Sequence, residues 1–300
     1  MSAQEFNTDP RNKVRSDLDS VGDGTTHDPI GHLSPDMLTG QVAFITGGGS
    51  GINLGIAKAF ARCGADVAIC GRTESKLAAA AAEIEALGAK VAYKAADVRD
   101  PEALAAAVDH AAEQLGDVSI AVAGAAGNFF AQAEKMSANA FATVVNIDLL
   151  GAYHTARAAF PYLERTKGSI LFISAGQAYK ANKFQAHVGA AKAGIEMLMK
   201  DLALEWGPKG IRSNSLVPGP VNGTEGMARL AGPTGAEEWR RAVPLGRWAD
   251  KEELGAMAAV LSGPLGAFVT GSQFVVDGGS GLATNPAISD AVERVLLSGD

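Results

Sequence analysis

Along most of the chain, short runs of apolar residues alternate with longer stretches in which apolar residues recur every three or four positions. The short runs predict buried strands, and the longer stretches predict amphipathic helices. The expected strands cover residues 42–46, 66–70, 90–94, 119–123, 169–174, 211–217 and 273–276. The expected helices cover residues 52–63, 74–87, 101–115, 138–164, 186–206 and 251–261. This alternation predicts an α/β fold with a doubly wound sheet of seven mainly parallel strands and helices on both faces.

The N-terminal segment breaks this pattern. Residues 1–40 carry Asp, Gly, Pro, Ser and Thr with little apolar periodicity, which predicts a flexible polar arm. Residues 41–281 are expected to form a single domain, because 300 residues with 47% hydrophobic content can bury one large core. Within that domain, residues 222–250 are expected to form a lid over the substrate. Residues 282–300 are expected to form a C-terminal tail.

Composition and charge exclude several classes of function. A formal net charge of -7 argues against nucleic-acid binding, which needs a positive field. No apolar run approaches the length of a membrane span, and the N-terminus lacks the pattern of a signal peptide, so we expect a cytoplasmic protein without a membrane partner. The two cysteines, Cys63 and Cys70, lack metal-type spacing and are expected to be reduced core residues, with no metal site.

A glycine-rich segment after the first expected strand is the main candidate for ligand binding. A strand that breaks into glycines before a helix leaves backbone N–H groups and the positive helix end open to an anion. The segment therefore predicts a phosphate site, although a turn without a ligand is the alternative. The residues expected to surround the phosphate are Gly47, Gly49, Ser50, Gly51 and Ile52.

This segment and several others resemble short-chain dehydrogenases/reductases. The glycine segment fits the family's T-G-x-x-x-G-x-G pattern, with Asn53 in place of the last glycine. Asn tolerates left-handed backbone angles and offers an amide donor, so we expect Asn53 to leave cofactor binding intact. Residues 41–281 are therefore identified as a Rossmann-type domain of this family, most similar to the peroxisomal-type 2,4-dienoyl-CoA reductases. The segments that carry the closer similarity are residues 125–129, 147–151, 187–193, 205–208 and 218–226.

The corner after the second strand indicates which dinucleotide is bound. An NAD enzyme of this architecture usually places an acidic residue there, whereas this chain has Arg72. A guanidinium can pair with a ribose 2′-phosphate, so NADP(H) is the expected cofactor; a solvated Arg in a turn is the alternative. The small side chain of Ala123 is expected to let the nucleotide lie on the backbone. The resemblance further implies an adenine site and a nicotinamide site, made of Asp97, Val98, Pro218, Gly219, Val221 and Thr224.

The family's catalytic tyrosine is missing. The family sets a Tyr thirteen residues after a strand-end Ser and four before a Lys; from Ser174 and Lys192 those positions are His187 and Val188. The resemblance to peroxisomal-type reductases implies that Lys192 binds the nicotinamide ribose, that Asp148 and a water deliver the proton, and that Ser174 contacts the thioester or the water.

Other interpretations of these residues stay open. Asp148 is a structural carboxylate paired with Lys192 in the simplest alternative. Tyr179, in a loop after Ser174, and His187 are alternative proton donors. Gln177 stands where mitochondrial-type relatives carry a Tyr fifteen residues before the Lys.

The expected activity is NADPH-dependent reduction of a conjugated acyl-CoA thioester, in fatty acid metabolism. The alternatives are an NADP-dependent ketoreductase or hydroxysteroid dehydrogenase, and a cofactor-binding sensor with little turnover. The resemblance implies a small-molecule substrate, an acyl-CoA, and a homotetramer, with a homodimer as the alternative. The chain ends in Ser298, Gly299 and Asp300 and so shows no peroxisomal targeting tripeptide, in keeping with the cytoplasmic expectation.

Overall fold

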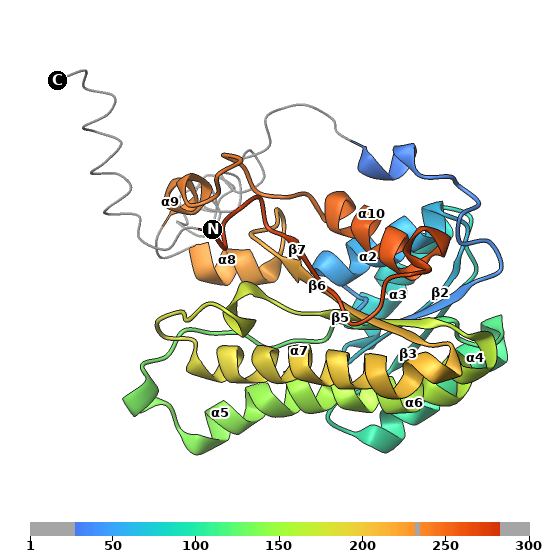
Figure 1. Cartoon of the computed structure of the whole chain (residues 1–300), viewed down its shortest axis with the longest axis horizontal. Helices are drawn as coiled ribbons and strands as arrows, with labels where there is room; N and C mark the ends of the chain where they lie inside the picture. Colours follow the sequence, from blue (N-terminus) through green and yellow to red (C-terminus); the bar gives the residue numbers. More distant parts are fainter. Residues whose placement is uncertain (1–27, 232–234, 283–300) are drawn as a thin grey trace, which may run out of the picture.

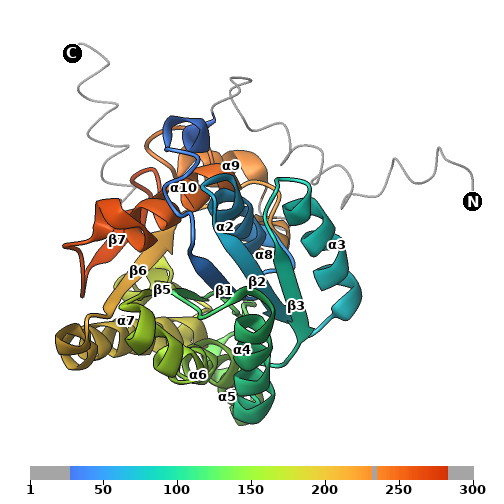
Figure 2. The same ribbon diagram turned by 90° about the vertical axis from the view of Figure 1, so that its right-hand side faces the viewer.

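A seven-stranded sheet forms the centre of the molecule (Figures 1 and 2). The structure is a computed structural model that describes residues 28–231 and 235–282. Every neighbouring pair of strands is parallel, in the order β3-β2-β1-β4-β5-β6-β7. Strand order reverses between β1 and β4, so a crevice opens there at the carboxyl ends of the strands. The strands are β1 (Val42–Thr46), β2 (Asp66–Gly71), β3 (Val91–Ala95), β4 (Ile120–Ala123), β5 (Ser169–Ile173), β6 (Arg212–Pro218) and β7 (Gln273–Val276).

Helices cover both faces of this sheet (Figure 2). One face carries α2 (Gly51–Arg62), α3 (Glu74–Glu85) and α10 (Lys251–Ser262). The other carries α4 (Pro101–Leu115), α6 (Gly151–Thr166) and α7 (Ala186–Trp206). The other α-helices in residues 28–231 and 235–282 are α5 (Ala138–Val145), α8 (Glu225–Ala231) and α9 (Ala236–Arg241). The predicted fold class is confirmed, with all strand pairs parallel.

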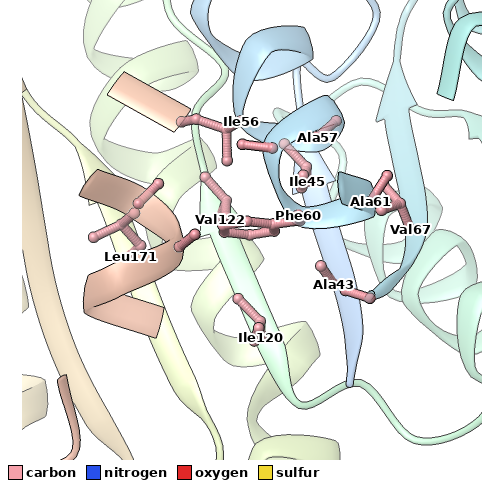
Figure 3. Packing of buried hydrophobic residues seen from close by; sticks show 14 of the residues in the cluster. Ala43, Ile45, Ile56, Ala57, Phe60, Ala61, Val67, Ile120, Val122 and Leu171 are labelled. Carbon is pink, nitrogen blue, oxygen red and sulfur yellow. The ribbon is translucent and has the colours of Figure 1, made fainter. Parts of the chain in front are cut away.

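Helix α2 shows how the apolar spacing builds the core. Ile56 and Phe60 lie one turn apart on the same helix face, and both are fully buried. Figure 3 shows them packed over Ile45 of β1 and Val122 of β4. Loss of the Phe60 ring would cost about 3–5 kcal/mol of stability, as is typical for a buried Phe replaced by Ala. This packing holds the start of α2 at the crevice.

Two glycines allow α2 to cross α10 closely. A Cβ on Gly55 would lie 2.6 Å from Cβ of Lys251, and a Cβ on Gly255 would lie 2.6 Å from Cβ of Ala59. Real Cβ atoms do not approach so closely, so larger residues at Gly55 or Gly255 would push the helices apart. The close crossing fixes the helix that begins in the glycine-rich segment.

The helix expected over residues 138–164 is interrupted by one π-helical turn. The turn η4 (Asn146–Leu150) joins α5 directly to α6. A π turn inserts one residue into the helical register and often occurs at functional sites. Apolar periodicity does not reveal it, because the helix axis continues on both sides. The turn carries Asp148, which is buried.

The packed part of the chain begins earlier than the boundary expected at Gln41. Ile30, in the short helix η2 (Pro29–His32), and Leu38 are buried in the main core. The backbone N–H of Leu38 donates to the carbonyl of Cys63 at 2.7 Å. Too few apolar residues lie in this stretch to give a periodic signal, so the sequence pattern missed it. The rest of the predicted arm, residues 1–27, and residues 283–300 of the predicted tail lie outside the described residues.

The segment expected to form a lid, residues 222–250, contains α8 and α9 and has a small core of its own. Met227, Ala231, Val243 and Trp248 are buried together there. In the part of the chain that the structure describes, no helix is both long enough and apolar enough to cross a lipid bilayer.

Candidate active site

A cleft of about 500 Å³ lies at the carboxyl edge of the sheet, where the strand order reverses. It runs from the glycine-rich segment to α8 and is lined by residues that follow β1 to β6. The predicted site residues that line it are Gly47, Gly49, Ser50, Gly51, Ile52, Arg72, Asp97, Val98, Asp148, Ser174, Lys192, Pro218 and Thr224. Three predicted residues do not line it: Ala123, Gly219 and Val221. The topology thus brings together residues from distant parts of the sequence.

The glycine-rich segment presents backbone rather than side chains to the cleft. Gly47 and Gly51 have φ values of 71° and 61°, which other L-residues rarely adopt. Ser50 precedes the first residue of α2 in an extended conformation. A Cβ on Gly48 would lie 2.5 Å from Cγ2 of Ile69, so the segment also packs closely on β2. Its amides and the positive end of α2 form the kind of cradle that binds a phosphate.

Asn53 lies within α2 and fastens this segment to the end of β4. Its Nδ2 donates to the carbonyl of Gly124 at 2.8 Å, and a Cβ on Gly47 would lie 2.8 Å from Nδ2. A Cβ on Gly124 would overlap the Asn53 amide. The expected use of a left-handed backbone at Asn53 is wrong, since the residue is helical, and one of the two N–H donors of its amide is bonded to Gly124.

The corner after β2 is exposed and positively charged. Arg72 lines the cleft with an exposed side chain. Lys76 follows one turn later and pairs with Glu225 of α8 at 2.8 Å. After the next strand, β3, Asp97 accepts hydrogen bonds from the Arg99 guanidinium, the shortest at 2.6 Å, and this contact holds the pKa of Asp97 below its usual value. The carbonyl of Val98 lies 2.8 Å from Nδ1 of His154.

The turn after β6 is shaped by close packing. A Cβ on Gly219 would lie 2.6 Å from Cα of Asp277, so this position needs a glycine. Val221 is buried and pairs with Ala249 in an isolated parallel bridge. The Thr224 hydroxyl donates to the carbonyl of Val221 at 3.0 Å and accepts from an amide in the first turn of α8. Gly219 and Val221 therefore shape the turn through their contacts with Asp277 and Ala249 and do not line the cleft.

A buried ion pair lies at the inner end of the cleft. Asp148 and Lys192 are 1% and 5% exposed, and Oδ2 of Asp148 is 3.4 Å from Nζ of Lys192. Oδ1 of Asp148 accepts from the backbone N–H of Gly127 at 2.7 Å, and Lys192 donates to the carbonyl of Ile173 at 2.9 Å. These contacts come from separate segments, and they hold both charged groups in fixed positions.

Burial raises the pKa of Asp148, and the Lys192 charge and the Gly127 amide oppose that rise. Among the described residues, neither Oδ2 of Asp148 nor the hydroxyl of Ser174 has a hydrogen-bond partner. Buried polar atoms in proteins are almost always paired. Since both residues line the cleft, these two atoms are available to bind a ligand or a solvent molecule, as is the unpaired Oδ1 of Asn53.

The two alternative proton donors lie outside the cleft lining. His187 is fully buried, and its ring lies 4.2 Å from that of Phe129 between centroids. Burial lowers the pKa of His187, which favours a neutral imidazole. Tyr179 is 47% exposed, and partial burial together with the Asp277 carboxylate raises the pKa of its phenol. Neither residue is therefore among those that line the cleft, although His187 stands thirteen residues after Ser174.

One further polar side chain lines the cleft beside the ion pair. Asn128 follows the Gly127 amide that holds Asp148, and its Oδ1 accepts from Nε2 of Gln185 at 2.9 Å. Gln185 is buried and in turn accepts from Gln177. Asn128 lies in segment 125–129, which carried the family resemblance, but its contact with Gln185 joins residues 57 positions apart and leaves no pattern in the sequence.

The chain is similar to several known proteins. Residues 47–281 match the family model described as enoyl-(acyl carrier protein) reductase. The chain is 42% identical to the (3E)-enoyl-CoA-producing peroxisomal 2,4-dienoyl-CoA reductase of Saccharomyces cerevisiae, over 83% of this chain and 87% of that protein.

Two solved structures are also similar. A short chain dehydrogenase from Bacillus anthracis has a TM-score of 0.74 and 35% identity, over 82% of this chain and 98% of that one. A gluconate 5-dehydrogenase from Burkholderia cenocepacia, solved with NADP and tartrate, has a TM-score of 0.78 and 28% identity, over 84% and 99%.

Proposed function

The chain belongs to the short-chain dehydrogenase/reductase family of oxidoreductases, and on that premise we propose that it reduces 2,4-dienoyl-CoA thioesters with NADPH. The observation that carries this proposal is the buried pair of Asp148 and Lys192 in a cleft that lacks the family's tyrosine. Relatives at about 40% identity are named as 2,4-dienoyl-CoA reductases, including one from Danio rerio. Carbonyl reduction needs an acid at the substrate oxygen. Of the two residues at the family's tyrosine positions, Val188 lines the cleft but carries no acid, and the alternative acids His187 and Tyr179 do not line it.

The residues of the cleft fit a nicotinamide dinucleotide phosphate. The glycine-rich segment offers amides and a helix end to the pyrophosphate, and Arg72 offers a guanidinium to a 2′-phosphate. When bound, the cofactor supplies the hydride. Lys192 binds the nicotinamide ribose, and the turn at Pro218 and Thr224 holds the ring. We propose these positions, together with the other predicted cofactor residues, as the dinucleotide site.

The residues around Asp148 and Lys192 stabilise the charge that develops on the substrate and supply the proton. As the conjugated thioester accepts a hydride, its oxygen gains negative charge, and hydrogen-bond donors stabilise that charge. We propose that Asn128 and Ser174, which both line the cleft, donate these hydrogen bonds. Asp148 orients a water molecule through Oδ2, and that water delivers a proton to carbon and takes its replacement proton from solvent. The Lys192 charge, 3.4 Å from Oδ2, opposes the rise in the pKa of Asp148 that burial causes.

The direct test is oxidation of NADPH followed by absorbance, with a dienoyl-CoA and with a panel of ketones. Rapid turnover of the dienoyl-CoA alone is the expected result. Turnover of ketones alone would favour a ketoreductase or hydroxysteroid dehydrogenase. Tight binding of NADPH without turnover of any substrate would favour the sensor.

We also propose a homotetramer, with a homodimer as the alternative. Large apolar side chains are exposed near the edge strand β7, among them Leu265, Phe268 and Val275. Such a group of exposed apolar side chains is typical of a protein interface. Light scattering coupled to size-exclusion chromatography measures the assembled mass directly.

Three further proposals concern domains, lid and location. Residues 41–281 form one domain, whose core also includes Ile30 and Leu38. Residues 222–250 close over the substrate, and proteolysis with and without NADPH tests the lid. We propose a cytoplasmic location, although several relatives are named peroxisomal. Microscopy of a fluorescent fusion decides between the two compartments.

A further inference from the structure

Three side-chain amides form a hydrogen-bonded chain that ends at the cleft. Gln177 donates through Nε2 to Oε1 of Gln185, and Gln185 donates through Nε2 to Oδ1 of Asn128, both at 2.9 Å. The three residues come from the short helix η5 (Gly176–Ala178), the position before α7, and the loop after β4. Of these three, Asn128 alone lines the cleft. These two hydrogen bonds, called the amide chain here, therefore connect a residue of the cleft to one outside it.

Backbone hydrogen bonds hold Gln185 and the loop of Asn128 in place. Gln185 is 5% exposed, and its carbonyl accepts from the N–H of Gly189 as α7 begins. The preceding residue, Phe184, has a φ of 67° and accepts at its carbonyl from the N–H of Ala131 at 3.0 Å. A positive φ at a bulky residue is unfavourable and persists only where surrounding contacts impose it. The loop of Asn128 and the start of α7 are thus fixed against each other.

Such a chain has a direction. A primary amide has a donor end and an acceptor end, so each member passes on the orientation of its neighbour. With Gln177 donating, Oδ1 of Asn128 faces Gln185, and its Nδ2 donors face away from Gln185. If the direction were reversed, Nδ2 of Asn128 would face Gln185, and Oδ1 of Asn128 would face away from Gln185.

We propose that Gln185 and Gln177 are positioning residues that keep the donor end of Asn128 turned toward the substrate oxygen. The proposal rests on the proposed function, because it concerns the oxygen that gains negative charge during reduction of the thioester. A donor at that oxygen stabilises the charge, whereas a carbonyl dipole in the same place would repel it. Gln177 controls this choice from outside the cleft.

A pair of substitutions at Gln177 separates direction from packing. In Gln177→Glu the ionised carboxylate only accepts, so Gln185 must donate to it and then accept from Asn128, which reverses the chain. In Gln177→Met the outer bond is lost but nothing forces a reversal. We expect kcat to fall about tenfold to a hundredfold in Gln177→Glu and about twofold to threefold in Gln177→Met, with the KM for NADPH nearly unchanged in both.

The ratio of the two kcat values is also measured against pH. Protonation of the introduced carboxyl group restores a donor at this position, so the deficit of Gln177→Glu relative to Gln177→Met should shrink as the pH falls. Equal kcat values for the two variants across the pH range would overturn the proposal. If wild type turns over no dienoyl-CoA, the proposed function fails instead, and the two failures are therefore distinct.

Gln185→Glu provides a second way to reverse the chain. Its carboxylate accepts from both Gln177 and Asn128, so Asn128 again turns its oxygen toward the cleft. The melting temperature and NADPH affinity of each variant show that it is folded. A folded Gln185→Glu variant with wild-type kcat would contradict the proposal even if the Gln177 variants could not be prepared.

Discussion

The two sides of the cleft are built from different parts of the chain. On the dinucleotide side the ligand surface is backbone, shaped by Gly47, Gly51 and the start of α2 within one short segment. On the other side, which holds Asp148 and Lys192 and is called the acid side here, the surface is made of side chains from separate segments. A few contacts hold them, such as the hydrogen bond from Gly127 to Asp148. Backbone surfaces tolerate changes that keep their angles and spacing, whereas the acid side depends on each polar atom. The largest effects of substitution should therefore arise on the acid side.

The largest loss of turnover is expected for Asp148→Asn. The amide keeps the shape of the side chain but no longer holds the negative charge next to Lys192, so the proton-delivering water loses its orientation. We expect kcat with a dienoyl-CoA to fall by about 10²- to 10⁴-fold, the usual contribution of general acid/base catalysis, with NADPH affinity retained. Steady-state kinetics and a binding titration measure both quantities.

Lys192→Ala is the matched change on the partner. It leaves a buried carboxylate unpaired and removes the proposed ribose contact, so both turnover and NADPH affinity should fall. If Asp148→Asn kept nearly normal turnover, the water mechanism would be wrong.

The same contrast explains what could be predicted from the sequence. Strand and helix positions and the glycine-rich segment follow from local patterns, and resemblance to relatives supplied Asp148 and Lys192. The π turn around Asp148, the packing of Leu38 and the bond from Asn53 to Gly124 were missed. The π turn is a one-residue change of helical register, and the other two features join residues far apart in sequence. Such features leave no periodic signal in the sequence.

On the dinucleotide side, the largest effect is expected from Arg72→Ala. Arg72 is the charged side chain expected at the 2′-phosphate, and a charge-assisted contact of this kind contributes about 1.5 to 3 kcal/mol. NADPH affinity should fall about tenfold to a hundredfold, while NADH affinity stays within a few-fold. Calorimetric titration of both cofactors measures the change. Equal affinity of wild type for the two cofactors would remove the basis for NADPH preference.

Gly124→Ala tests the fit between the glycine-rich segment and β4. The added Cβ would overlap the Asn53 amide, and overpacking of this kind costs about 1–3 kcal/mol of stability. Asn53→Gly should restore the space and recover most of that loss in the double variant, as measured by urea unfolding. On its own, Asn53→Gly should change NADPH affinity less than about tenfold, since the Asn53 amide is bonded to Gly124. Additive losses in the double variant would show that the two residues do not interact.

The smallest effects on turnover are expected from Tyr179→Phe and His187→Ala. Neither side chain lines the cleft, the phenol has a raised pKa, and the imidazole is buried against Phe129. Loss of the buried ring should lower the melting temperature of His187→Ala, whereas kcat per folded enzyme should fall less than about tenfold in both variants. A collapse of turnover in Tyr179→Phe, beside a nearly normal Asp148→Asn, would mean that the loop moves and that a relocated phenol acts on a carbonyl. The acid side would then depend on one mobile side chain rather than on a fixed buried pair, and the contrast between the two sides of the cleft would disappear.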